Sequence, residues 1–140
     1  MCLKDLVVGL NSYFPVHGHC HYSFKDNIVT IDAQGPFNLE FFIEMHNDLE
    51  KFVYEYANFK NFAILLIMRG NTLALIDAVK YHETRVERGT ARAIAVNLSH
   101  SECAAATETQ MGAAYDNAGL NNAFFEDLTQ AKQWLLSQLD

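Results

Sequence analysis

Hydrophobic and polar positions change their period along the chain, and each period predicts a type of element. Residues 16–24 alternate between apolar and polar side chains, which is typical of a strand with one face on a core. A turn cluster separates them from a second predicted strand over 28–33, so the pair should form a hairpin. Continuous apolar runs over 62–68 and 92–98 predict strands that are covered on both faces, and a short strand is expected over 122–125.

Apolar residues at helical spacing over 39–57 predict the first helix, which Asn38 can cap. This segment is rich in large aromatic side chains, and they cannot all face one sheet. Phe41 and Tyr54 fall off the main apolar stripe. Their position indicates a second contact surface, covered either by residues 1–15 or by another subunit, so a homodimer is expected as an alternative to a monomer.

A second helix is predicted to begin at residues 70–72 and to end at Gly89, a residue type favoured just after a helix. Its inward positions are expected to be Leu75, Ile76, Val79 and Val86. His46, on the apolar stripe of the first helix, is expected to be a hydrogen-bonded core or boundary residue. His82, next to Glu83 on the second helix, is expected to be solvated.

Residues 99–101 lead into a third predicted helix that Gly119 ends, and a final helix is predicted over 128–139. The order β-β-α-β-α-β-α-β-α implies right-handed crossovers and a mixed, mainly parallel sheet with covering helices. We therefore expect one α/β domain over 16–140, preceded by an N-terminal arm or short helix over 1–15.

Composition and charge exclude several classes of protein. The chain has 17 acidic and 10 basic residues, and its net charge of −7 argues against binding nucleic acid or an anionic membrane through a basic face. No apolar run approaches the length of a membrane span, so no integral membrane segment is expected. The three cysteines form no CxxC pair, which is typical of free thiols and predicts a cytoplasmic protein.

Three segments carry a resemblance to a known family. They are the opening strand over 28–35, the buried strand RAIAV over 92–96, and the closing FFED at 124–127 with Ala131, Trp134 and Leu135 after it. Together they resemble the SpoIIAA-like, or STAS-like, domains, relatives of anti-sigma factor antagonists, over residues 16–139. The resemblance implies a SpoIIAA-like fold and a binding or regulatory role rather than an enzymatic one.

The resemblance also implies a candidate switch. In the antagonists a serine or threonine at the start of the helix after the third strand is phosphorylated, typically after an aspartate. Here that region reads MRGNT over 68–72, in which Thr72 is the nearest hydroxyl and Asn71 stands where the aspartate would be. Phosphorylation of Thr72 would place charge at a helix N-terminus and change which protein partner docks there.

Polar residues follow two predicted strands at points where parallel sheets bind ligands, beyond the carboxyl ends of the strands. These ligand or phospho-switch candidates are Arg69, Asn71, Thr72, Ser99, His100 and Ser101. Arg69 could pair with an anionic group while Asn71 and Thr72 donate hydrogen bonds to it. Plain helix capping is the alternative, because Asn, Ser and Thr are preferred at helix N-termini anyway.

His17, His19 and His21 share one face of the first predicted strand. Two imidazoles at this spacing could ligate zinc, nickel or copper. No carboxylate or cysteine in the same stretch completes the ligand set, because Cys20 points to the opposite face. The alternative is therefore a solvated face of an edge strand.

The chain contains no GxSxG, Walker A or GxGxxG motif, so neither an enzyme nor a cofactor is expected. We expect a non-catalytic binding or regulatory module with a protein partner. A small-molecule or lipid-binding carrier, with an apolar pocket between helices and sheet, is the alternative. An unfilled cavity above about 300 Å³ would support that alternative.

Overall fold

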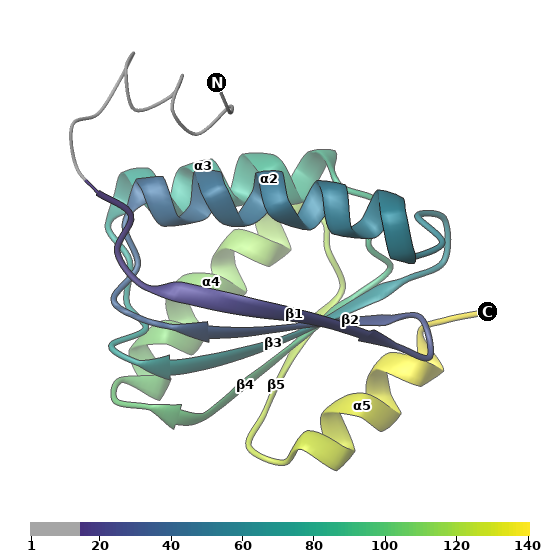
Figure 1. Cartoon of the computed structure of the whole chain (residues 1–140). Helices are drawn as coiled ribbons and strands as arrows, with labels where there is room; N and C mark the ends of the chain where they lie inside the picture. The colour runs from purple at the N-terminus through teal and green to yellow at the C-terminus, as the bar shows by residue number, and fades with distance from the viewer. Residues whose placement is uncertain (1–14) are drawn as a thin grey trace.

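The computed structural model describes residues 15–140 and confirms the predicted order of strands and helices (Figure 1). The strands are β1 His19–Lys25, β2 Ile28–Gln34, β3 Ala63–Gly70, β4 Ile94–Ser101 and β5 Asn122–Phe125. The helices are α2 Leu39–Tyr56, α3 Ile76–Arg88, α4 Ala104–Ala118 and α5 Leu128–Ser137. The arm or short helix predicted over 1–15 lies, except for Pro15, outside the described residues.

The strands form a sheet in the order β1-β2-β3-β4-β5, so neighbours in sequence are neighbours in space. β1 pairs with β2 in an antiparallel hairpin, and the other neighbouring pairs are parallel. The predicted mixed, mainly parallel α/β fold is therefore confirmed. Among the helices of the described part, none is long and apolar enough to cross a membrane.

The sheet separates two apolar cores (Figure 1). α2, α3 and α4 cover one face, whereas α5 covers part of the other. Successive residues of a strand point to opposite faces, so Leu66 packs under the first group of helices and Leu65 packs under α5. This two-sided burial explains why β3 and β4 read as continuous apolar runs.

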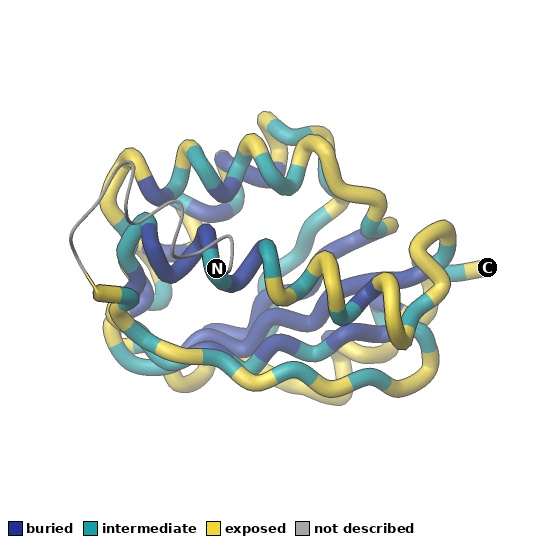
Figure 2. Tube along the Cα trace, turned by 45° about the horizontal axis from the view of Figure 1, so that its top comes forward, coloured by how far each residue is buried: buried dark blue, intermediate teal, exposed yellow. Residues whose placement is uncertain are grey.

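β1 is an edge strand with one half-buried face, as its alternating sequence predicts. Figure 2 shows half-buried and exposed residues alternating along it. The strand begins at His19 rather than at residue 16, because Gly18 bends the chain just before it with φ +78°. A Cβ at Gly18 would lie 2.4 Å from the backbone oxygen of Gln34, so the bend accepts only glycine.

At the first helix the predicted cap is confirmed, but the prediction that Phe41 lies off the buried face is wrong. The Asn38 side chain accepts a hydrogen bond from the Phe41 backbone N–H at 2.9 Å. Phe41 is buried, contrary to prediction, because Phe37 in the preceding loop packs on its ring and widens the buried stripe. Tyr54 is 88% exposed, and the homodimer that this helix suggested stays a prediction.

The second helix begins later than the sequence pattern predicted. β3 continues through Gly70, and α3 begins at Ile76 after a loop. Leu75 and Ile76, predicted to face inward, are 70% and 73% exposed. The buried face of α3 carries Ala78 and His82 instead. Leu75 precedes the helix and Ile76 is its first residue, and neither lies on the face that packs against the rest of the chain. His82 is buried because it lies four residues after Ala78, on the same helix face.

The third helix also begins later than predicted. Residues 99–101 continue β4, and α4 begins at Ala104. It ends where predicted, because Gly119 adopts the left-handed conformation with φ 76° that follows many helices.

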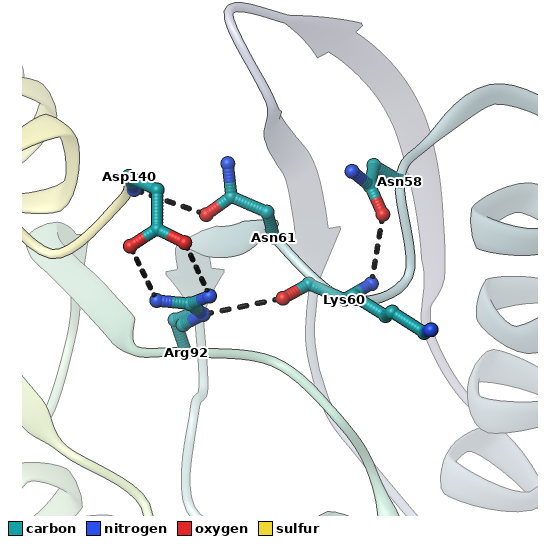
Figure 3. A network of polar contacts seen from close by, with 5 residues as sticks. All are labelled: Asn58, Lys60, Asn61, Arg92 and Asp140. Carbon is teal, nitrogen blue, oxygen red and sulfur yellow. Dashed lines mark hydrogen bonds and ion pairs between the residues drawn. The ribbon is translucent and has the colours of Figure 1, made fainter.

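A polar network holds the connection between α2 and β3 (Figure 3). Arg92, just before β4, makes two hydrogen bonds to the carboxylate of Asp140 at 2.7 and 3.0 Å and donates to the backbone oxygen of Lys60. The backbone N–H of Asp140 donates to the side chain of Asn61. These contacts fix the loop that carries Phe59, which borders a cavity described below.

Candidate functional site

The six residues predicted as ligand or phospho-switch candidates lie at the carboxyl edge of β3 and β4. Arg69 pairs with His100 and Gly70 with Ser101 in the parallel ladder, so both strands run beyond their apolar segments. None of the six is at a helix N-terminus, which corrects the prediction. Backbone groups make the ladder, so pairing can continue where the side chains become polar. Asn71, Ser99 and His100 are exposed.

Arg69 already has an anionic partner inside the sheet. Its Nε lies 2.7 Å and its Nη2 3.1 Å from the carboxylate oxygens of Asp32 on β2, and both side chains are about one-third exposed. This hydrogen bond lowers the pKa of Asp32 and raises that of Arg69; the nearby His21 and His100 lower the Asp32 pKa further. An external anion would therefore have to compete with Asp32 for Arg69.

Thr72 is completely buried in a cluster of hydroxyl groups. Its Oγ1 lies 2.6 Å from Ser101 Oγ and 2.6 Å from Thr107 Oγ1. Ser101 Oγ also accepts the backbone N–H of Cys103, the residue before α4. The cluster ties the β3–α3 loop to the start of α4, so Thr72 has a structural role that the sequence pattern did not reveal.

The same cluster activates a cysteine that sequence reasoning did not select. Cys103 Sγ lies 3.5 Å from Thr72 Oγ1 and 3.7 Å from Thr107 Oγ1. Hydrogen bonding, chiefly from the Thr72 hydroxyl, lowers the pKa of Cys103 to about 7. Burial raises the pKa of Cys20, the half-buried thiol on β1.

Cys103 should therefore react with iodoacetamide at least about tenfold faster than Cys20 at pH 7.5, because the thiolate is the reacting form. Its rate should rise with pH through a midpoint near 7. In a Thr72→Val variant the midpoint should move upward. Peptide mass spectrometry of timed alkylation reports each cysteine separately, and equal rates for the two would contradict this assignment.

The histidines of the first strand are only partly brought together. His19 and His21 lie on the exposed face of β1 with ring centroids 5.9 Å apart. His17 lies before the bend at Gly18, outside the strand, and its backbone N–H donates to Asn38. Within residues 15–140, no three His, Cys, Asp or Glu side chains are placed to hold one metal ion. Metal binding through these histidines stays a prediction.

A buried chain of polar rings links α2, α3 and α4. His46 Nε2 lies 2.7 Å from His82 Nδ1, and His82 Nε2 lies 2.9 Å from the Tyr115 hydroxyl. His46 is hydrogen-bonded in the core, as predicted, whereas His82 is 2% exposed and not solvated. Burial lowers the pKa of His82 to about 3. Burial also lowers the pKa of His46, and so do the repulsion that a second proton on His82 would cause and the repulsion from the Arg85 cation. Both rings are therefore neutral at physiological pH.

His46 also lines a cavity of about 540 Å³ between the C-terminal halves of α2 and α3. The wall is mainly apolar and includes Leu49, Val53, Phe62, Ile64, Val86 and Leu120. Tyr54 and Phe59, 88% and 52% exposed, stand at its mouth. Arg85 also borders the cavity, but its guanidinium is bonded to Asn47, Tyr81 and Glu50.

A second hollow, of about 670 Å³, lies at the opposite end of the sheet between the start of α2 and the β3–α3 loop. Phe37, Leu73 and Leu75 are among its lining residues, and His17 forms part of its wall. Residues 1–14 precede this wall directly and lie outside the described part of the chain. The 540 Å³ cavity is therefore the better-defined candidate for a ligand.

Comparison with known proteins found a protein of the same fold but none with a known function. No protein-family model matches the chain, and no curated protein matches it. Among solved structures, the chain is similar to an uncharacterized protein of the DUF3478 family from Shewanella loihica PV-4, whose crystal structure has a SpoIIAA-like fold. The TM-score is 0.58 at 15% sequence identity, over 87% of this chain and 96% of that chain. This chain has a SpoIIAA-like fold. The predicted resemblance is thereby confirmed at the level of architecture.

The cavity lies away from the predicted ligand site, between helices and sheet, where the alternative of a small-molecule carrier expected its pocket. Ligand sites were expected at the carboxyl ends of the strands. The cavity instead borders Phe62 and Ile64, at the amino end of β3, and Ala91, before β4. No sequence pattern marks it, because its lining residues come from helix ends and loops far apart in the chain.

Proposed function

We propose that this SpoIIAA-like chain is a non-catalytic binding module that takes a small apolar molecule into the cavity between α2 and α3. The observation that carries the proposal is the cavity itself. Its volume of about 540 Å³ falls in the range of small-molecule sites, which are mostly apolar with a few placed polar groups. His46 supplies such a polar group, buried in a wall that is mainly apolar.

The exposure of aromatic side chains at the mouth supports the same proposal. Tyr54 and Phe59 are large, apolar and solvent-exposed next to an unfilled apolar space, an arrangement that marks binding sites more often than ordinary surface. A phosphorylation-controlled regulator has less support, because the hydroxyl of Thr72 is buried among its partners. A protein partner stays a prediction.

Naphthalene is a suitable first probe, because it is rigid, neutral and smaller than the cavity. We expect it to bind with a dissociation constant of about 10–1000 µM, a range set by the ligand efficiencies of small molecules. Methyl NMR should show saturable shifts at Leu49, Val53, Ile64 and Val86, which line the cavity.

A cavity-filling variant and a matched control test where the probe binds. Ala91→Phe adds a ring beside the cavity and should weaken naphthalene binding at least about tenfold. Ala113→Phe makes the same change on the exposed side of α4 and should leave binding unchanged. Equal affinity of the two variants, or shifts that never saturate, would overturn the proposed function.

A further inference from the structure

One ring nitrogen of His46 has a hydrogen-bond partner within the described residues, and the other has none. Its Nε2 lies 2.7 Å from His82 Nδ1, and the side chain is 7% exposed. Its Nδ1 has no hydrogen-bond partner within residues 15–140, while the residue lines the 540 Å³ cavity. A buried polar ring with a free nitrogen in an apolar wall is a contact point for a ligand.

The polar chain determines which His46 nitrogen carries the proton. Tyr115 is fully buried, and within the described residues its hydroxyl has His82 Nε2 as its hydrogen-bond partner. The hydroxyl hydrogen is satisfied only if it is donated to that nitrogen. His82, neutral because it is buried, must then carry its own proton on Nδ1 and donate it to His46 Nε2. His46 is left with its proton on Nδ1.

The opposite arrangement is unfavourable. If His82 donated from Nε2 to the Tyr115 oxygen, the Tyr115 hydrogen would be buried with no acceptor among the described residues. Folded proteins avoid unpaired buried donors, because the lost hydrogen bond to water is not replaced. The fixed tautomer therefore makes His46 a donor rather than an acceptor toward the cavity.

We propose that His46 Nδ1–H is the specificity contact of this cavity and selects apolar molecules that carry a neutral carbonyl oxygen. The inference rests on the proposed function and names its ligand class. A hydrocarbon leaves the N–H unpaired, and an amine or ammonium group presents a second donor to it. A carboxylate is disfavoured at His46, because the wall there is mainly apolar and the guanidinium of Arg85 is already bonded to Glu50. Arg88, the other cation that lines the cavity, is exposed to solvent.

A pair of isosteric probes tests the selection. In 2-acetylnaphthalene a carbonyl oxygen stands where 2-isopropenylnaphthalene has a methylene group, and the two are otherwise alike in shape. We expect wild-type protein to bind the ketone about fivefold more tightly than the alkene, the ratio that one neutral hydrogen bond provides. A ¹⁵N spectrum of the wild-type protein should show His46 protonated at Nδ1, with a shift at that nitrogen when the ketone is added.

Two variants separate the contact from the chain that positions it. His46→Phe removes the donor and should abolish the preference, so that the ratio of the two affinities falls to about one. Tyr115→Phe removes the hydroxyl that fixes the tautomers, without touching the cavity wall. The Tyr115→Phe variant should reduce the preference for the ketone at least about twofold and give signals from both tautomers of His46. If Tyr115 only supported the fold, its loss would change neither the preference nor the tautomer.

The outcomes also separate this inference from the proposed function. If both probes bind the cavity of the wild-type protein equally well, or if His46 is protonated at Nε2, the carbonyl selection is wrong and the binding function stands. If neither probe produces saturable shifts at the cavity residues, the proposed function fails, and the inference fails with it.

Discussion

The free energy of unfolding should fall by about 3 kcal/mol as the pH is lowered from 7 to 4.5, because His82 is buried as a neutral ring. Its pKa is about 3 in the folded chain and about 6.5 in an unfolded one. Between these values the unfolded state binds a proton that the folded state excludes. Stability is therefore complete above pH 6.5 and is lost progressively as the pH falls toward 3.

His46 adds to the same loss, since burial and repulsion from a protonated His82 and from the Arg85 cation also lower its pKa. Urea unfolding followed by circular dichroism at a series of pH values measures the slope. The triple variant His46→Phe, His82→Phe, Tyr115→Phe replaces the polar chain with apolar rings and should flatten the slope, whatever its absolute stability.

A matched control uses a histidine that the fold does not bury. His19 is exposed on β1, so His19→Gln should leave the pH dependence of the wild-type protein unchanged. A wild-type protein whose stability stays constant from pH 7 to 4.5 would show that the two rings are not held neutral. That result would also remove the basis for the tautomer assigned to His46.

Replacing Thr72 by aspartate should destabilise the fold by more than about 3 kcal/mol, the second large effect that we expect. Thr72 is 0% exposed, and its nearest polar groups are the hydroxyls of Ser101 and Thr107. A carboxylate there would be buried without a cation to pair with. Thr72→Val should cost about 2 kcal/mol, because it removes the shortest hydrogen bond of both the buried Thr107 hydroxyl and the half-buried Ser101 hydroxyl.

Asn71→Asp is the control for this experiment. It places the same carboxylate one residue earlier, on an exposed side chain, and should change stability by less than about 0.5 kcal/mol. A Thr72→Asp variant as stable as Asn71→Asp would show that the loop opens readily. Phosphorylation of Thr72 would then be feasible in the folded protein, and the regulatory interpretation would gain support.

The ends of β3 and β4, at the carboxyl edge of the sheet, could not be predicted from the sequence. Apolar runs indicated where β3 and β4 begin, but both strands continue through polar residues as far as Gly70 and Ser101. Each strand extends because the other pairs with it. The sequence around one strand end does not show whether a partner strand will be there. Leu75 is exposed because it precedes α3, and His82 is buried because it shares a helix face with Ala78.

The sequence by itself determined the type and order of the elements. A period of two, a period of 3.6 and a continuous apolar run have different physical causes, so each could be read from a short window. The cap at Asn38 and the stop at Gly119 were equally local, because each depends on the backbone within one turn.

Only the tertiary structure decided the candidate sites. The 540 Å³ cavity exists because side chains of α2, α3 and two loops do not meet above β3. The polar contact that we propose for it, His46 Nδ1–H, depends on Tyr115 of α4, which contacts His82, which in turn contacts His46. The thiol of Cys103 likewise depends on Thr72, 31 residues away in the chain. Packing brings such groups together over long sequence separations, and no local pattern records which side chains will meet or leave a space.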